Sequence, residues 1–432
     1  MITARYVREN IDVIRKSLDK RKSTYPIDEL LALDEEYRKM QKEAQELRER
    51  RNKGSREVSD ARKAGRDADA KIEELSGIKQ RLEEIETRMP AHEERISYYL
   101  LNMPNVLDDS VPYGKDENEN KVVKSVGRSE AREMPTHEET LIALDLLDLE
   151  QAAKVSGARF YYLKGDLALL EQALIRFAID EMVKKNYMLI APPLMLRNEF
   201  YRGVTAIGDF EEALYKVEDP KEVEEGNDLE RMKDDLFLIA TSEHAIAALN
   251  AEKVFSGKEL PKRYVGVSPC FRREAGSHGK DSKGIFRVHQ FYKVEQFIVS
   301  KPQDSWRMFD ELIKNTEQLF EKLGIPYRIV NICTGDIGIV AAKKFDLEAF
   351  MPGQGKYREM ASCSNCTDWQ ALRLDIKYDE AGERKYVHTL NSTAIATTRT
   401  LVAIVENYRN QDGTVKIPDV LVPYMNGKSR LG

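Results

Sequence analysis

Charged and aromatic residues gather between Ser268 and Ser300 in a pattern that could bind a nucleotide. Two runs of alternating apolar residues flank a loop rich in Gly, Lys, Ser and Asp, which predicts a β-hairpin with a long turn. Because strand side chains alternate between faces, Arg272 and Glu274 share one face and Arg273 takes the other. One face of the return strand carries Arg287, His289, Phe291, Lys293 and Glu295.

A sheet face of this composition is poorly suited to a core, because buried charges are costly unless they are paired. Arginine offers phosphate a planar fork of donors, and a phenylalanine ring offers a base a stacking surface. A nucleoside triphosphate, flat at one end and anionic at the other, has the matching shape. A solvated face with incidental ion pairs explains the same residues equally well, so the hairpin alone leaves both interpretations open.

Thr241, Ser242 and Glu243 form a second polar cluster, at a predicted junction between a strand and a helix. The first turn of a helix exposes N–H donors that could hold a ligand. The same residue types are also ordinary helix caps, and capping alone would explain them.

Glu359 and Ser362 belong to a third cluster, on a predicted strand. They are three residues apart, so a regular strand would place them on opposite faces. Both could reach one metal ion only if the strand bulges or ends between them.

Arg399 lies on a predicted apolar helix behind a fourth cluster, which consists of Asn391, Ser392 and Thr393. An arginine in that setting needs a partner. Either a triphosphate tail or a structural carboxylate would serve.

Two further motifs resemble a phosphate-binding loop and a zinc site but lack residues that these sites need. Gly427–Ser429 resembles the end of a phosphate-binding loop, but Val422 stands where its first glycine belongs. Cys363 and Cys366 form one CxxC pair while the other two cysteines are isolated, and a closed zinc site needs four ligands. We therefore expect no zinc.

The N-terminal quarter has the pattern of two long helices. Apolar residues recur at steps of three and four over residues 30–61 and again over 72–99, which predicts an antiparallel coiled-coil hairpin that turns at 64–67, after a short lead-in helix over 7–20. Pro90 predicts a kink or a helix boundary in the second helix. Basic residues near the tip could grip the phosphates of a polyanion, although coiled coils carry charge everywhere outside the seam; these residues are Lys53, Arg56, Arg62, Lys63 and Arg66.

The rest of the chain predicts an α+β domain around an antiparallel sheet, because strands and helices alternate without a regular strand–helix–strand repeat. We expect domains at 1–110 and 111–432, with a polar linker over 105–140 and an exposed charged insertion over 216–235. Helices are predicted at 137–150, at 166–185 with Asp166 as N-cap, from 241 to about 254, from 306 to 323 and at 393–408. Strands are predicted at 188–191, 236–240, 327–332, 345–351 and 357–363, with a last one ending at 389–390.

Composition limits the partners and the cellular compartment that we expect for the protein. The 432 residues carry a net charge of −6, with 33% charged and 41% hydrophobic residues, which argues against a generally basic nucleic-acid coat but allows a local basic stripe. No apolar run reaches the roughly 18 residues of a membrane span, and the N-terminus lacks a signal-peptide core. We expect a cytoplasmic protein with no membrane partner.

Taken together, these motifs resemble the class II aminoacyl-tRNA synthetases and, within them, the seryl-tRNA synthetase family. The helical hairpin resembles that family's tRNA-binding arm, 166–186 with Pro192 and Pro193 resembles motif 1, 271–297 resembles motif 2 and 390–410 resembles motif 3. Ser392–Ala394 and Thr398 depart from the bacterial pattern of glycines, and this form is more similar to archaeal and eukaryotic cytosolic members.

The resemblance implies an enzyme that activates serine with ATP and Mg²⁺ and transfers it to tRNA(Ser), and to tRNA(Sec) where present, as a homodimer. It implies catalytic roles for Arg272 at the α-phosphate and Arg399 at the γ-phosphate, and Mg²⁺ ligation by Glu359 and Ser362. It implies serine contacts from Thr241, Ser242, Glu243, Arg272, Glu295, Asn391 and Thr393. The implied ATP contacts are Arg272, Arg273, Glu274, Val288, Phe291, Glu359, Met360, Ala361, Ser362 and Arg399.

Two alternatives remain at this point. A ligase derived from this family could load a carrier protein, but it would have no use for the long arm. A non-catalytic tRNA-binding relative would not need Arg272, Glu274, Glu359 and Arg399.

Overall fold

The computed structural model describes residues 4–205, 213–217, 235–274 and 283–432. The chain divides into two compact units, Ile2–Pro104 and Asn105–Gly432. The predicted division at residue 110 into tRNA-binding and catalytic domains concerns function and stays a prediction. Among the described residues no helix is both long and apolar enough to cross a lipid bilayer.

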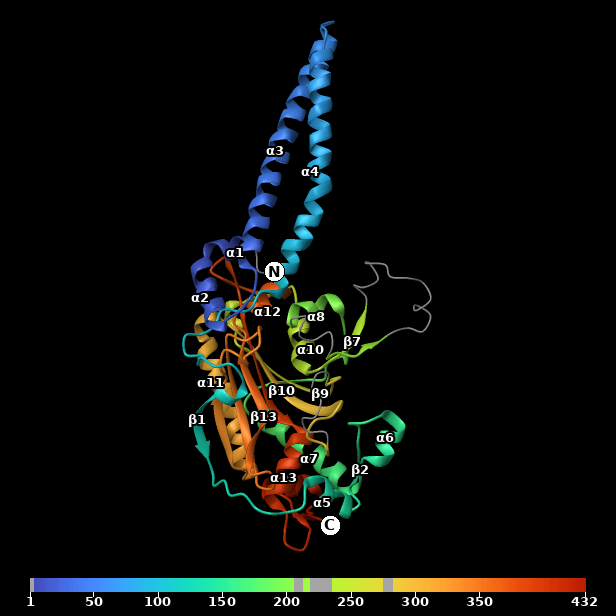
Figure 1. The fold of residues 1–432 in the computed structure, drawn as a ribbon, viewed down its shortest axis with the longest axis vertical. Coiled ribbons are helices and arrows are strands. Elements are labelled where there is room, and N and C mark those ends of the chain that lie inside the picture. The colour runs from blue at the N-terminus through green and yellow to red at the C-terminus, as the bar shows by residue number, and fades with distance from the viewer. Residues whose placement is uncertain (1–3, 206–212, 218–234, 275–282) are drawn as a thin grey trace. The chain divides into compact units, whose positions relative to one another are not determined.

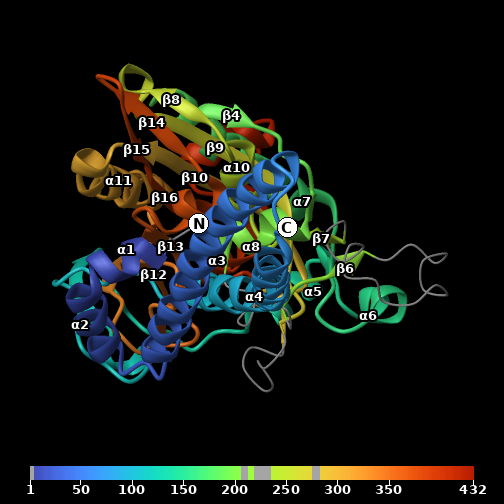
Figure 2. The ribbon, with the colours of Figure 1, turned by 90° about the horizontal axis from the view of Figure 1, so that it is seen from above.

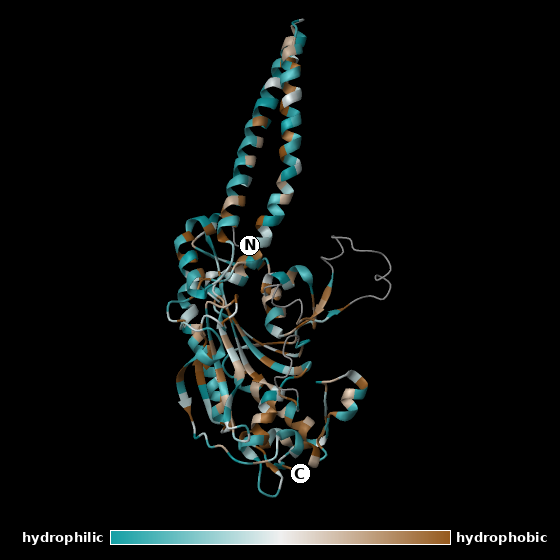
Figure 3. Cartoon of the chain, in the orientation of Figure 1, coloured by the Kyte–Doolittle hydropathy of each residue, from teal (hydrophilic) through white to brown (hydrophobic). Residues whose placement is uncertain are grey.

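The first unit is built on two long helices, α3 (Ile27–Lys63) and α4 (Asp69–Asn102), which lie side by side as the heptad pattern predicted (Figure 1). Their shared seam buries Met40, Ala44, Ile78, Leu82 and Ile85. The remaining surface of both helices is largely hydrophilic, with apolar residues at intervals (Figure 3). This pattern is that of a coiled coil, in which a narrow apolar stripe holds the pair together.

Two details of this unit differ from the sequence-based expectation. The lead-in is two helices, α1 (Ala4–Glu9) and α2 (Ile11–Arg21), because the backbone leaves helical geometry at Asn10; α1 contacts both α2 and α3 (Figure 2). Helix α4 continues through Pro90, so of the two outcomes predicted there the helix boundary is wrong and the kink stays a prediction.

The second unit is organised around a sheet that, within the described residues, has eight strands in the order β1-β11-β12-β13-β16-β10-β9-β4. Neighbouring strands are antiparallel except for β4 and β9, which confirms an α+β fold on an antiparallel sheet. The strands are β1 (Lys121–Val126), β4 (Met188–Ile190), β9 (Lys262–Phe271), β10 (Gln290–Ser300), β11 (Tyr327–Asn331), β12 (Lys343–Met351), β13 (Lys356–Asn365) and β16 (His388–Ala396).

Helices α7 (Gly165–Val183) and α11 (Ser305–Leu323) contact β10 and β16 from one side of this sheet (Figures 1 and 2). They join Val294 and Ile298 in the main core, whose side chains alternate with that of Glu295 along β10. Burial on this side leaves the opposite face of β10, β13 and β16 available for polar residues.

Smaller elements complete the unit. The helices are α5 (His137–Ala143), α6 (Glu150–Ser156), α8 (Asn198–Val204), α10 (Ser242–Leu249), α12 (Trp369–Leu374) and α13 (Thr397–Tyr408). The short strands are β2 (Leu147–Asp148), β3 (Tyr162–Leu163), β5 (Met195–Arg197), β6 (Lys216–Val217), β7 (Leu236–Leu238), β8 (Val254–Ser256), β14 (Lys377–Glu380), β15 (Glu383–Tyr386), β17 (Val415–Lys416) and β18 (Arg430–Leu431).

Several predicted boundaries in this unit are wrong. The predicted linker contains strand β1, whose exposed residues reflect its place at the sheet edge. Strand β16 runs on to Ala396 because β10 pairs with it as far as that residue, so the predicted helix starts at Thr397 rather than residue 393. Asp166 pairs with Lys428 instead of capping α7. Helix α10 ends at Leu249, and the single helix predicted over 137–150 is α5, a short strand and the start of α6. Of the predicted insertion, 218–234 lies outside the described residues.

Candidate functional site

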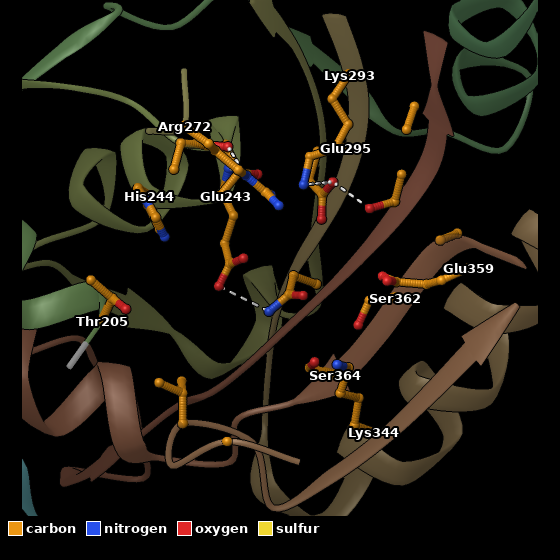
Figure 4. A pocket seen from close by; sticks show the side chains of 18 of the residues that line it. Thr205, Glu243, His244, Arg272, Lys293, Glu295, Lys344, Glu359, Ser362 and Ser364 are labelled. Atoms are coloured by element: carbon orange, nitrogen blue, oxygen red, sulfur yellow. Dashed lines mark hydrogen bonds and ion pairs between the residues drawn. The ribbon is translucent and has the colours of Figure 1, made fainter. Parts of the chain in front are cut away.

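A cavity of about 330 Å³ opens on the polar face of the sheet (Figure 4). Its walls come from the residues just after β9, from the first half of β10, from β13 and β16, and from the first turns of α10 and α13. These elements come from widely separated parts of the sequence, so the cavity exists only in the folded chain.

Strand β10 lays Phe291, Lys293 and Glu295 along the cavity, in the alternation predicted from the sequence. The Lys293 ammonium lies 2.8 Å from Glu295 Oε2, and their side chains are only 8% and 2% exposed. Thr393 Oγ1, across on β16, donates a hydrogen bond to the same carboxylate at 3.1 Å. Glu295 is therefore held rigidly at one end of the cavity, and Phe291 lies toward the other.

Glu243, in the first turn of α10, faces the same end of the cavity. Its Oε1 accepts hydrogen bonds from Gln370 Nε2 at 2.9 Å and from Asn391 Nδ2 at 3.0 Å. Burial, with the nearby charge of Glu295 as a second cause, raises the pKa of Glu243 to about 7. Two carboxylates and two hydroxyl or amide groups thus converge on a small volume suited to an ammonium and a hydroxyl.

Arg272 and Glu274 lie just beyond the end of β9 rather than within a strand, and Arg287 and His289 precede β10. The predicted strands therefore end before these four residues, although the Arg272 N–H still donates to the His289 carbonyl at 2.9 Å. Glu274 and Arg287 nevertheless form an ion pair of 2.8 Å on the cavity wall.

The Arg272 guanidinium is fixed in the cavity by two contacts. Its Nε donates to the Ala240 carbonyl at 3.3 Å, and its carbon Cζ lies 5.3 Å from the centroid of the Phe291 ring. A cation above an aromatic ring at this distance is attracted by the ring, so Arg272 stands between the carboxylate end and the aromatic end.

A β-bulge at Met360 brings Glu359 and Ser362 to the same face of β13 despite their spacing of three residues. On β12, Leu347 faces Ala361 while the next residue, Glu348, faces Glu359, so Met360 is the extra residue. The bulge shifts the alternation by one position, and Glu359 and Ser362 both line the cavity (Figure 4).

Arg399, in the first turn of α13, meets Glu359 across the cavity. Its Nη1 lies 3.2 Å from Glu359 Oε2 and donates to the Glu359 carbonyl at 3.0 Å. Burial alone would raise the pKa of Glu359, but Arg399, with Lys344 and Arg272, outweighs it and holds that pKa well below its usual range. Glu359 is therefore an anion that could exchange Arg399 for another cation.

The structure gathers nearly all the predicted site residues in this one cavity. Ser242 and Arg273 do not line it; Ser242 is fully buried and packs against Gly266 of β9. Their predicted ligand contacts thus lack support from this geometry. The predicted residues on the wall are Thr241, Glu243, Arg272, Glu274, Val288, Phe291, Glu295, Glu359, Met360, Ala361, Ser362, Asn391, Thr393 and Arg399.

Sequence reasoning missed several residues of the wall. Lys344 of β12 lines the cavity. The alternation of Lys344 and Asp346 along a strand could have indicated a polar face. Phe286 and His244 also line the cavity. Both look like ordinary core residues in the sequence, and no local pattern distinguishes them.

The residues present fit a divalent cation that shares its shell with phosphates. Glu359 and Ser362 offer two oxygen ligands on one face, and Mg²⁺ commonly takes one or two carboxylates together with substrate phosphates. Within the part of the chain that the structure describes, no three His, Cys, Asp or Glu side chains gather as a metal-binding group. The thiols of Cys363 and Cys366 have separate partners, the Phe309 carbonyl and the Asn391 amide.

Comparison with known proteins agrees with this arrangement. The model of the seryl-tRNA synthetase N-terminal domain matches residues 1–107, and that of the tRNA synthetase class II core domain (G, H, P, S and T) matches residues 215–408. A serine–tRNA ligase of Methanocella arvoryzae is 49% identical over 435 residues, which cover 99% of each chain.

Solved structures show the same likeness. The seryl-tRNA synthetase of Pyrococcus horikoshii, complexed with ATP, superposes with a TM-score of 0.91 at 44% identity and covers 100% of this chain and 99% of that one. The cytoplasmic serine–tRNA ligase of Naegleria fowleri, in complex with AMP, gives a TM-score of 0.83 at 39% identity, with 97% and 95% covered.

Proposed function

The chain belongs to the seryl-tRNA synthetase family of class II aminoacyl-tRNA synthetases, and we propose that it is a serine–tRNA ligase. The observation that carries this proposal is one cavity with a carboxylate cluster at one end, an aromatic ring at the other and Arg272 between them. Phe291 and Glu295 are four strand residues apart, about 13 Å at roughly 3.3 Å per residue, which suits an adenosine joined through phosphate to an amino acid.

At the carboxylate end, Glu243 and Glu295 would hold the serine ammonium and hydroxyl, with Asn391 and Thr393 completing the pocket. Glu295 already accepts from Thr393 and Glu243 from Asn391, so these acceptors need little rearrangement. A pocket that hydrogen-bonds a substrate hydroxyl rejects alanine, because its buried polar groups would be left unpaired.

At the aromatic end, Phe291 would stack on adenine, while Glu274 and the Val288 backbone would read its edge. Arg272 would hold the α-phosphate and Arg399 the γ-phosphate. The ion pair of Arg399 with Glu359 would then open, because the arginine would exchange a carboxylate for a phosphate.

A magnesium ion held by Glu359 and Ser362 would supply positive charge that neutralises the phosphates. The protein groups orient the rest of the reaction. Arg272 would align the serine carboxylate for in-line attack on the α-phosphorus, which releases pyrophosphate and forms seryl-adenylate. The terminal ribose hydroxyl of tRNA would then attack the adenylate carbonyl, and AMP would leave.

The helical hairpin would bind the tRNA(Ser) body, and tRNA(Sec) where an organism has it. The basic residues near its tip are exposed, as a contact with phosphates requires. They are Lys53, Arg56, Arg62, Lys63 and Arg66.

We further propose that the protein is a homodimer through α7 and β4. Val183, Met188 and Leu189 on these elements are 47%, 61% and 48% exposed, although all three are apolar. Exposed apolar side chains on two elements in contact favour burial against a second copy.

The test is amino-acid-dependent exchange between ATP and pyrophosphate, measured with the full panel of amino acids and followed by charging of tRNA(Ser). We expect exchange with serine alone and transfer to tRNA. Exchange with another amino acid would assign a different specificity. Exchange without tRNA charging would favour a carrier-protein ligase, and no exchange at all would favour a non-catalytic tRNA-binding protein.

A further inference from the structure

The short segment from Gly284 to Val288 links the hairpin loop to β10 and forms part of the nucleotide end of the cavity. Phe286 and Val288 line the cavity wall, while Ile285, directly before Phe286, is fully buried. This segment is not paired within a strand, so a contact outside the sheet must fix the position of these side chains in the cavity.

His137, 148 residues earlier in the sequence, holds this segment. Its ring Nε2 accepts a hydrogen bond from the Ile285 N–H at 3.2 Å, in a buried environment. Since a backbone N–H can only donate, Nε2 must carry a lone pair, which excludes the doubly protonated ring. Loss of this acceptor would leave a buried N–H unpaired.

Gly284 allows the histidine to approach this closely. Its φ of +70° is a conformation that side-chain-bearing residues rarely adopt, and a Cβ built on it would lie 2.0 Å from His137 Nε2. The ring therefore occupies the space that the side chain of any other residue at position 284 would fill. The hydrogen bond from Ile285 to His137 thus requires glycine at this position.

The histidine is itself fixed by the start of α5. Thr136 and Glu139 form a capping box, in which the Glu139 N–H donates to Thr136 Oγ1 at 3.2 Å and the Thr136 N–H donates to Glu139 Oε2 at 2.9 Å. This reciprocal cap holds the first helical turn, where His137 lies.

Phe286 carries the effect of this contact to the phosphate end of the cavity. Its ring contacts two guanidinium groups, with Arg358 Cζ 4.0 Å and Arg399 Cζ 5.1 Å from the ring centroid. Arg358 also donates to Gln354 Oε1 at 2.8 Å, and Gln354 Nε2 donates to the Glu406 carboxylate at 2.7 Å. The phenyl ring is thus held by a fixed arginine, and the same ring supports Arg399.

We propose that His137 is a positioning residue for ATP. Its hydrogen bond fixes the position of the Ile285 backbone, so that Phe286 supports Arg399 and Val288 presents its backbone to adenine. This inference rests on the proposed function. It assigns a role in the active site to a residue of the segment that the sequence suggested was a linker.

The experiment compares His137→Leu, which removes the acceptor, with His137→Gln, which retains one at similar reach. His388→Leu is the matched control, since it removes the contact of another histidine ring with Ser305 Oγ, at 2.9 Å, away from the cavity wall. We expect His137→Leu to raise the KM for ATP in serine-dependent exchange about fivefold, the effect of one lost hydrogen bond. The KM for serine should stay unchanged, as should both constants in the other two variants.

Gly284→Ala provides a second route if His137→Leu does not fold, because its methyl group would push the segment away from the ring. It should raise the KM for ATP alone, and where both single variants fold the double variant should add nothing further. Equal changes in the two KM values, a normal KM for ATP in both variants, or no rescue by His137→Gln would each overturn the inference. Wild-type protein without serine-dependent exchange would overturn the proposed function instead.

Discussion

The two long helices and the cavity contain ion pairs of nearly the same length in opposite surroundings. Arg48 Nη2 and Glu86 Oε1 lie 2.7 Å apart between α4 and α3, with side chains 51% and 48% exposed. Lys293 and Glu295 lie 2.8 Å apart in the cavity, with side chains 8% and 2% exposed. Water screens the first pair but hardly screens the second, so equal distances correspond to unequal energies.

The difference indicates how each region can perform its proposed task. Most charges outside the helical seam are solvated and interchangeable, which suits contact with phosphates by charge alone. Charges in the cavity have few partners and fixed positions, which suits the selection of one small substrate. Changes of charge should therefore be tolerated on the hairpin and not in the cavity, unless the hairpin as a whole is removed.

Removal of residues 28–100 separates the two regions most completely. We expect serine-dependent pyrophosphate exchange to stay near the wild-type rate, because the cavity belongs to the other compact unit. The kcat/KM for charging tRNA should fall about 10³-fold, the scale on which losing several phosphate contacts acts. Exchange and charging are measured on the same preparation, and charging that survives would show that the hairpin does not bind tRNA.

Glu295→Gln tests the cavity directly. The variant keeps an acceptor for Thr393 but leaves the buried Lys293 ammonium without a counter-charge. We expect the kcat/KM for serine to fall about 10²-fold, since loss of one member of a buried charged pair costs about 2–5 kcal/mol.

Glu86→Gln makes the same chemical change in the exposed pair and is the matched control. Its exchange activity and thermal midpoint should equal those of the wild type. If both variants lost activity to the same extent, the contrast between the two regions would be wrong.

Local sequence patterns predicted those features that depend on neighbouring residues. The heptad spacing of α3 and α4 is one example, and the end of α11 at Gly324, which adopts φ of +66°, is another. The alternation of Phe291, Lys293 and Glu295 along β10 is a third. In each case a period or a single residue type is sufficient to determine the local geometry.

The missed features depend on distant partners. The bulge at Met360 is visible only in the register between β12 and β13, and β16 extends through Ala396 only because β10 pairs with it as far as that residue. The approach of His137 to Ile285 spans 148 residues. Local propensity carries no information on such contacts, and tertiary pairing overrides it.

Glu243 should make the stability of the protein depend on pH, which the exposed glutamates of the hairpin should not. Its pKa of about 7 lies above that of an unfolded glutamate, so the folded protein binds this proton more tightly. The free energy of unfolding of the ligand-free protein should therefore fall as pH rises from about 4.5 through about 7, by on the order of 3 kcal/mol.

Denaturant titrations at several pH values measure this loss. Glu243→Gln cannot ionise and should remove this part of the slope, whereas the exposed Glu86→Gln should leave it unchanged. An equal slope in wild type and Glu243→Gln would place the titration elsewhere.

Arg81→Ala should have the smallest effect, although this arginine makes two contacts of 2.7 and 3.2 Å with Glu43 across the helical pair. Both side chains are more than 40% exposed, so water replaces the lost partner and the thermal midpoint should not change measurably. The neighbouring Leu82, 3% exposed in the seam, is the control, because Leu82→Ala should cost about 2–5 kcal/mol. If Arg81→Ala destabilised the hairpin as much as Leu82→Ala, its ion pairs would be structural, and the solvated surface proposed to meet phosphates would not be free to do so.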